Sequence, residues 1–231
     1  ARIENLRIVG VTKEETPEVY DTFMEYTTKA YASEKSPLEL SFIPIHPGDI
    51  LSYGGYHFEV KLLKGHTFGQ CGLYEPEKKL MFVGDQLMTT IVPIVGTQET
   101  DLGMLKCYLD SLGDLKHNYK DCYFLPCHYG EIKNVEKEVN RIILGYLEKC
   151  EIMKHVLEEA GTALTTRDIG VRTYGRSQGP PDYAHFASCT YIWAKTFSCM
   201  EYMMGEGFVE RSERDGIIYW KAPSIHFENN R

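Results

Sequence analysis

The stretch HPGDILSYGGYHFEVKLLKGHTFGQCGLYEPEKKLMFVGDQL, residues 46–87, determines which fold we expect for this chain. Short runs rich in Val, Ile, Phe and Tyr alternate in it with turns of Gly, Pro, Asp and Glu, a pattern typical of β-strands. The same pattern appears again further along the chain. The predicted strands cover residues 50–52, 57–63, 71–74, 79–83 and 122–125.

Two helices are expected between and after these strands, over residues 102–115 and 134–149. In both segments the apolar residues recur at three- and four-residue spacing, which places them on one helix face. Because strands and helices alternate, we expect an α/β layered fold up to about residue 145.

The rest of the chain has a different order of predicted elements, in which helices precede a β-hairpin. This order is typical of a winged helix, a small α+β domain. We therefore expect two domains, residues 1–149 and residues 150–231. The predicted elements of the second are helices over 151–160 and 183–204, a helix between them opened by Thr165, Thr166 and Asp168 in the manner of an N-cap, and a hairpin over 208–221 that turns at Asp215-Gly216.

The composition of the 231 residues is that of a globular protein, with 43% hydrophobic and 25% charged residues. No apolar run reaches the length of about 18 residues that a membrane helix needs, and the first residues lack the apolar core of an export signal. Seven irregularly spaced cysteines favour reduced thiols, so we expect a cytoplasmic protein without a membrane partner.

Charge disfavours nucleic acid as the main partner. The net charge is −8, and residues 151–231, with 9 basic and 11 acidic side chains, contribute −2 of it. The predicted long helix is aromatic and holds a single basic residue, Lys195. A helix that reads DNA bases should present several basic or amide side chains, so we expect this one to be a packing element over a cleft or in a homodimer interface.

Three segments place a metal-capable side chain where a predicted strand meets a glycine-containing loop. They are Gly65-His66-Thr67-Phe68-Gly69, Val83-Gly84-Asp85 and Leu125-Pro126-Cys127-His128-Tyr129-Gly130. Ligand sites collect at such strand ends, and imidazole and carboxylate groups suit zinc and its neighbours. A single histidine at a strand end is more often a structural residue. The three segments together favour a site.

The set closely resembles the metallo-β-lactamase superfamily over about residues 40–145. That family has a Gly-His-Thr-Pro-Gly-His loop, a Gly-Asp turn and a later Pro-Gly-His-Gly turn in this order. The resemblance implies an αββα sandwich in which His66 ligates a first metal, His128 ligates a second, and Asp85 bridges the two. Phe68 stands where the family usually has Pro, and Gln70 where it often has a second His.

The family's His-x-His-x-Asp-His motif is absent, since no two of the eight histidines lie two residues apart. We therefore expect this chain to be the C-terminal portion of a metallo-β-lactamase-fold domain, followed by the winged helix. The half of the sandwich that carries the motif is expected to precede it in a longer protein.

By the same resemblance the complete site holds two zinc ions, with iron or manganese as possible replacements. A metal-bound hydroxide would attack an ester, a thioester or a phosphodiester. Tyr129, next to His128, is a candidate for hydrogen bonding an oxyanion or phosphate, although a packing role on the loop is the commoner alternative. Arg172 and Arg176, around the 175–182 loop, are the remaining candidates for contacting an anionic substrate.

A different class of function stays open. A relative with a decayed site would act as a binding or regulatory protein through its winged helix. The retained His66, Asp85 and His128 favour the hydrolase, because decay would be expected to erase isolated ligands.

Overall fold

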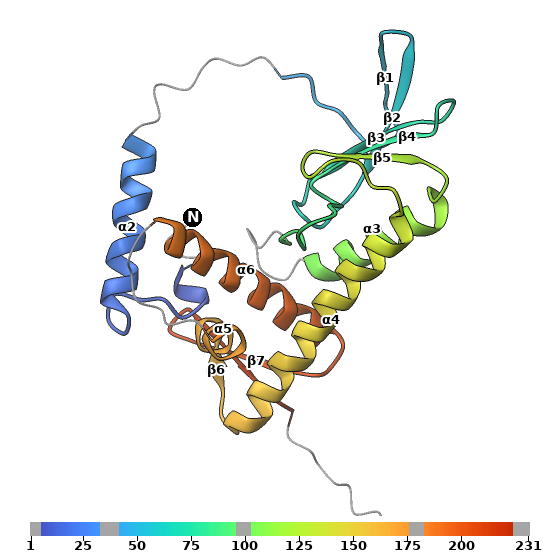
Figure 1. The fold of residues 1–231 in the computed structure, drawn as a ribbon. Coiled ribbons are helices and arrows are strands. Elements are labelled where there is room, and N and C mark those ends of the chain that lie inside the picture. Colours follow the sequence, from blue (N-terminus) through green and yellow to red (C-terminus); the bar gives the residue numbers. More distant parts are fainter. Residues whose placement is uncertain (1–5, 33–41, 96–102, 176–182, 224–231) are drawn as a thin grey trace, which may run out of the picture. The chain divides into compact units, whose positions relative to one another are not determined.

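The structure is a computed structural model that describes residues 6–32, 42–95, 103–175 and 183–223. The chain divides into two compact units (Figure 1). One unit consists of residues 36–147, and the other combines residues 1–35 with residues 148–231. Each unit is described by itself below.

The first unit is built on a five-stranded sheet with the strand order β1-β2-β3-β4-β5. Strands β1 to β4 form an antiparallel meander, and β5 pairs with β4 in the parallel direction. A parallel neighbour needs a long crossover, and here helix α3 (Met104–Asn118) lies in it. All five predicted strands are confirmed, as β1 (Ile50–Tyr53), β2 (Tyr56–Leu62), β3 (Cys71–Glu75), β4 (Leu80–Gly84) and β5 (Tyr123–Pro126).

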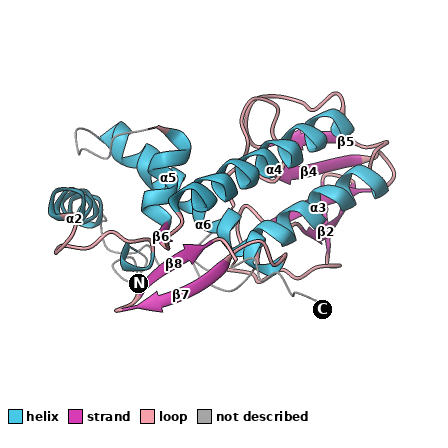
Figure 2. Ribbon diagram, turned by 90° about the horizontal axis from the view of Figure 1, so that it is seen from below, coloured by secondary structure: helices cyan, strands magenta, loops and turns pink. Residues whose placement is uncertain are grey.

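The two faces of this sheet differ in burial. On β4 the alternate residues Met81 and Val83 are fully buried, whereas Phe82 between them is 40% exposed. Figures 1 and 2 show α3 and the following helix α4 on the same side of the sheet. The other face is apolar and half exposed, with Leu62 and Tyr123 also among its residues.

Helix α4 runs without interruption over Val135–Ala160, so the expectation of two helices that meet near residue 150 was wrong. The sequence between residues 149 and 151 holds no Gly or Pro that would end a helix. Its apolar stripe also continues past that point at three- and four-residue steps. The buried members of the stripe are Val135, Val139, Ile142, Tyr146, Cys150, Met153 and Leu157.

The second unit contains the predicted helix, helix and hairpin order. Thr165 caps α5, because its hydroxyl accepts a hydrogen bond from the Asp168 amide at 3.1 Å. Asp215 and Gly216 have φ values of +53° and +75°, the signs that a type I′ hairpin turn requires. The elements are α2 (Pro17–Ala32), β6 (Leu164–Thr165), α5 (Thr166–Tyr174), α6 (Tyr183–Gly205), β7 (Glu210–Arg214) and β8 (Ile217–Lys221), with the strand order β6-β8-β7 (Figure 2).

The N-terminal residues pack with this second unit, which differs from the expected boundary of 1–149 and 150–231. The Arg167 amide donates a hydrogen bond to the Val9 carbonyl at 2.9 Å. Arg7 donates to the Asp215 carbonyl at 2.8 Å. These contacts join residues about 160 and 208 positions apart, a separation that local sequence patterns do not encode.

No helix in the described ranges is long and apolar enough to cross a bilayer. Among the residues of α6 whose side chains the structure describes, most of the aromatic and sulfur-containing ones are inside the unit, as the sequence suggests for a packing element. Trp193, Phe197 and Met200 are buried, and the Phe197 ring packs edge-on against Trp220 with centroids 5.7 Å apart.

The continuous stripe on α4 yields a stability prediction. Ile142→Ala should lower the free energy of unfolding by about 2–5 kcal/mol, because it opens a cavity at a fully buried position. Leu144→Ala, two residues away and 57% exposed, should cost less than about 0.5 kcal/mol. Urea unfolding followed by circular dichroism compares the two variants. Equal losses would contradict the assigned helix face.

Candidate functional site

The parallel pairing of β4 and β5 brings two of the predicted site residues to one edge of the sheet. Gly84 at the end of β4 is in register with Pro126 at the end of β5, and the Cys127 amide donates to the Gly84 carbonyl at 3.1 Å. Asp85 and His128 directly follow these positions. Gly84 has a φ of +56°, a left-handed conformation that glycine adopts without strain, and a Cβ there would have to displace the end of the Gln70 side chain, 2.2 Å away.

His66 reaches the same edge on the loop between β2 and β3. The Leu63 amide donates to the Gln70 carbonyl at 2.7 Å, which closes this loop at its base. Gly65 has a φ of +149°, and a Cβ there would lie 2.2 Å from the ring of Tyr108. The loop therefore rests directly on α3, and this close approach places His66 over the strand ends.

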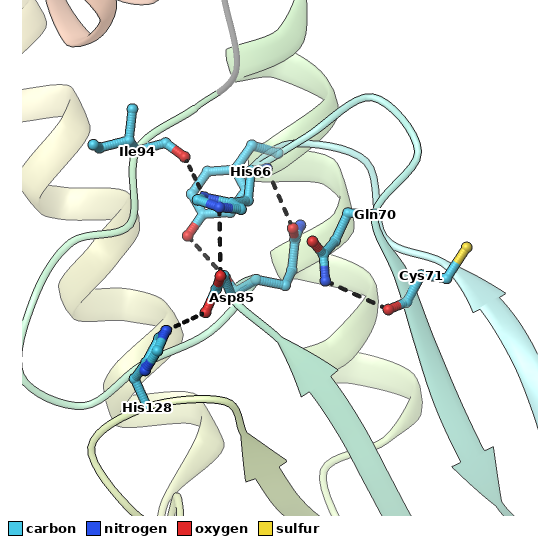
Figure 3. A network of polar contacts seen from close by, with 8 residues as sticks. His66, Gln70, Cys71, Asp85, Ile94 and His128 are labelled. Carbon is cyan, nitrogen blue, oxygen red and sulfur yellow. Dashed lines mark hydrogen bonds and ion pairs between the residues drawn. The ribbon is translucent and has the colours of Figure 1, made fainter. Parts of the chain in front are cut away.

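The structure brings the three predicted ligands together (Figure 3). His66 Nε2 lies 3.6 Å from Asp85 Oδ2, and His128 Nε2 lies 3.4 Å from Asp85 Oδ1. Each imidazole thus faces a different oxygen of one carboxylate. His66 and Asp85 are partly buried, whereas the His128 side chain is 61% exposed and forms the open side of the group.

The hydrogen bond on the far side of His66 fixes which nitrogen faces Asp85. Nδ1 of His66 lies 2.9 Å from the Ile94 carbonyl, and a carbonyl can only accept, so Nδ1 carries the proton. In the neutral ring Nε2 then presents a lone pair to the Asp85 carboxylate. Two acceptors face each other across this gap, which is favourable only with a proton or a cation between them.

A second observation concerns the other oxygen of Asp85. Oδ1 is buried and accepts no hydrogen bond within the part of the chain that the structure describes. Its near neighbour is His128 Nε2 at 3.4 Å, which makes no hydrogen bond to it, and a buried carboxylate oxygen without a hydrogen bond is costly.

The spacing of the donor atoms allows each imidazole to share a metal ion with the Asp85 carboxylate. Two atoms about 2.0–2.2 Å from one tetrahedral zinc lie roughly 3.3–3.6 Å apart, and the two histidine–carboxylate pairs, at 3.6 and 3.4 Å, are close to this range. Among the described residues, however, no group of three or more His, Cys, Asp or Glu side chains is arranged to hold one ion. The described residues therefore provide donors in pairs. One pair is His66 with Asp85, and the other is His128 with Asp85.

Tyr129 lies beside His128 in an unusual backbone conformation. Its φ is +67°, in the left-handed region that few large residues adopt, and its carbonyl accepts a hydrogen bond from Thr89 at 3.2 Å. The ring is 54% exposed, and its centroid is 6.1 Å from that of His128. Arg172 lies on α5 in the other unit, and Arg176 lies outside the described residues.

Sequence reasoning missed Gln86, a fully buried polar residue next to Asp85. Its side-chain amide donates to the Lys64 carbonyl at 3.1 Å and to the Ser111 hydroxyl at 3.0 Å, and its oxygen accepts from the His66 amide at 3.5 Å. The Tyr108 hydroxyl donates to the Gln86 carbonyl at 2.8 Å. These bonds join the His66 loop, the Asp85 turn and α3. The sequence offered no clear signal for this role, since Gln86 directly follows the polar Asp85.

Comparison with known proteins identifies the fold. No protein-family model matches the chain. A β-lactamase domain protein from Burkholderia ambifaria superposes with a TM-score of 0.77 at 18% identity, over 94% of this chain and 60% of that one. A metallo-β-lactamase family protein from Thermus thermophilus gives 0.65 at 20% identity, over 87% and 65%. The chain therefore has the mixed α/β fold of metallo-β-lactamase proteins.

One curated protein shows a short sequence match. Hydroxyacylglutathione hydrolase GloC of Haemophilus influenzae is 50% identical over 40 residues, which are 17% of this chain and 19% of that protein. The chain spans 65% or less of the length of each of these three proteins.

The buried Tyr108 predicts an alkaline sensitivity. Burial raises the pKa of the Tyr108 phenol above its usual value, so its contribution to stability is complete below about pH 10 and is lost as the pH rises further, at up to about 1.4 kcal/mol per pH unit. Tyr108→Phe should cost about 1–3 kcal/mol at pH 7, because the Gln86 carbonyl loses its partner, and should flatten the alkaline decline.

Urea unfolding between pH 7 and 11 measures both effects. Tyr53→Phe, at an 83% exposed position, is the matched control and should behave as wild type. An alkaline slope in Tyr108→Phe as steep as in wild type would count against this role for Tyr108.

Proposed function

We propose that this chain contributes His66, Asp85 and His128 to the metal centre of a zinc-dependent hydrolase. The observation that carries the proposal is the partly buried Asp85 carboxylate, whose two oxygens face one imidazole each at 3.6 and 3.4 Å. The fold supports it, since most proteins of this superfamily are hydrolases. Iron or manganese would suit the same nitrogen and oxygen donors.

In the proposed centre His66, Asp85 and His128 would hold the zinc, each imidazole together with the shared carboxylate. When bound, zinc lowers the pKa of a water molecule toward about 7 and polarises the substrate oxygen. The chain's own residues orient these donors. The Ile94 carbonyl keeps the Nε2 lone pair of His66 directed at Asp85, and the parallel strand ends keep Asp85 beside His128.

Tyr129 completes the proposal as a substrate-contacting residue. Its left-handed backbone conformation costs energy that a packing role at a 54% exposed position would not repay. The neighbouring ring of His128 places the tyrosine at the open side of the group. We assign it to hydrogen bonding the developing negative charge on a carbonyl or phosphoryl oxygen.

Substrates of the proposed hydrolase are thioesters, other esters or phosphodiesters. The 40-residue match to a hydroxyacylglutathione hydrolase supports the thioester, which is the substrate to assay first. The net charge of −8 weighs against a polyanionic phosphodiester such as RNA.

Zinc binding tests the proposal. Asp85→Asn keeps the shape of the side chain but removes its charge, and should weaken zinc binding at least about 100-fold, since even partners behind a ligand are worth about 10–100-fold. Competition with a chromogenic chelator measures the affinity, and thioester hydrolysis is assayed on the same samples. His66→Ala and His128→Ala should act in the same direction.

Asp49→Asn is the matched control. Asp49 also faces a histidine, since its Oδ2 is 3.7 Å from His46 Nδ1, but both lie exposed at the start of the β1 hairpin. This variant should bind zinc as wild type does. Equal affinity in wild type, Asp49→Asn and Asp85→Asn would reject the proposed centre.

A second candidate rests on the observation that no three ligands surround one ion within the described ranges. In this alternative the chain is a catalytically incomplete relative that binds a partner or nucleic acid through a winged helix. We propose that domain for residues 150–231, where β6, α5, α6 and the β7–β8 hairpin occur in the required order. Burial lowers the pKa of Lys195, the single basic residue of α6, and this weakens the case for phosphate binding.

Binding of duplex DNA at increasing salt separates the two candidates. The hydrolase proposal predicts no salt-dependent binding tighter than the non-specific range of about 10⁻⁴–10⁻⁶ M. Fluorescence anisotropy of a labelled duplex measures it. Tight, salt-sensitive binding without thioester or phosphodiester hydrolysis would favour the alternative.

A further inference from the structure

Between β4 and α3 the described backbone of residues 85–95 forms no helix or strand, yet it carries the carbonyl that orients His66. The peptide groups of such a segment cannot pair in a ladder, and buried ones need other partners. Its position is therefore set by whichever side chains reach its carbonyls.

Helix α4 supplies those side chains. Arg141 Nη2 donates to the Met88 carbonyl at 2.7 Å and to the Ile91 carbonyl at 3.2 Å. The Tyr146 hydroxyl donates to the Pro93 carbonyl at 2.7 Å. Three carbonyls within six residues are thus held from one helix, and the last of them immediately precedes Ile94.

Arg141 is itself held in place. Its Nε donates to Glu138 Oε2 at 2.8 Å, and the Glu138 side chain is only 13% exposed. The guanidinium is planar and always charged, so the bond to Glu138 fixes the plane in which Nη2 meets the two carbonyls. A lysine ammonium carries its three donors on one atom and lacks the planar fork that aims Nε at the carboxylate and Nη2 at the carbonyls.

We propose that Arg141 is a positioning residue of the candidate metal centre, which acts through the 88–94 segment to hold the Ile94 carbonyl against His66 Nδ1. The inference rests on the proposed function for its effect on metal, but its effect on His66 stands without metal. Releasing the segment would let the Ile94 carbonyl withdraw, and the neutral imidazole would then also take the Nε2–H form, which has no lone pair on the nitrogen that faces Asp85.

The test compares Arg141→Met with Lys137→Met, which removes the same charge from the same helix. The ¹⁵N shifts of the His66 ring are recorded on the full, metal-free chain at about pH 8.5, where an ordinary imidazole is neutral. Zinc affinity is measured separately by chelator competition. Arg141→Met should shift His66 toward a mixture of tautomers and weaken zinc binding about 10-fold. Arg141→Lys should lie between, and Lys137→Met should match wild type.

Tyr146→Phe removes one hydroxyl from the core and serves as a second variant if Arg141→Met does not fold; it should shift His66 in the same direction. A purely structural role would lower the melting temperature and leave the tautomer and the zinc affinity unchanged, and that result would overturn the inference. A His66 tautomer that depends on Arg141 in a chain that binds no zinc would support the positioning role while rejecting the proposed metal centre.

Discussion

The parallel pairing of β4 with β5 is the constraint from which the candidate site follows. In an antiparallel pair the residues after the two strands would lie at opposite ends of the sheet. Here both strands end at the same edge, in register at Gly84 and Pro126, so Asp85 and His128 meet although 43 positions separate them. The pairing requires a crossover, and the crossover provides α3, against which the His66 loop rests. One topological choice therefore assembles all three side chains.

The crossover between β4 and β5 also brings polar backbone groups into the interior. Side chains, rather than a helix or a strand, provide the hydrogen bonds that these groups need. Gln86 and Tyr108 satisfy the turn after β4, while Arg141 and Tyr146 hold the irregular segment that follows. Buried polar groups in such networks are costly when unpaired. Asp85 Oδ1 differs from these groups, because it is buried and accepts no hydrogen bond from the described residues.

The sequence predicted well those features that depend on local pattern. Alternating apolar runs identified all five strands of the sheet, and Asp215-Gly216 identified the hairpin turn, because only a few residues tolerate that backbone conformation. The predicted break in α4 was wrong because the change of pattern near residue 150 does not interrupt the apolar period of the helix. The packing of residues 6–11 on α5 and the hairpin depends on contacts between distant residues, which no local pattern specifies.

For the site, the motifs identified the side chains that meet, but not those that hold them. His66, Asp85 and His128 were recognisable because each follows a predicted strand and lies within two residues of a glycine. Gln86, Tyr108 and Arg141 sit in ordinary helix or turn contexts, and their roles arise only when the crossover folds back.

Helix α4 shows why such supporting residues escape a reading of the sequence. Its buried stripe includes Val139, Ile142 and Tyr146, as any amphipathic helix would. Glu138 and Arg141 lie at the edge of the same stripe. Because the helix is firmly packed, Arg141 can hold the 88–94 segment, which forms no helix or strand. The position of the site residues thus depends on the packing of the core. A substitution that loosens α4 should therefore disturb the core and the site together.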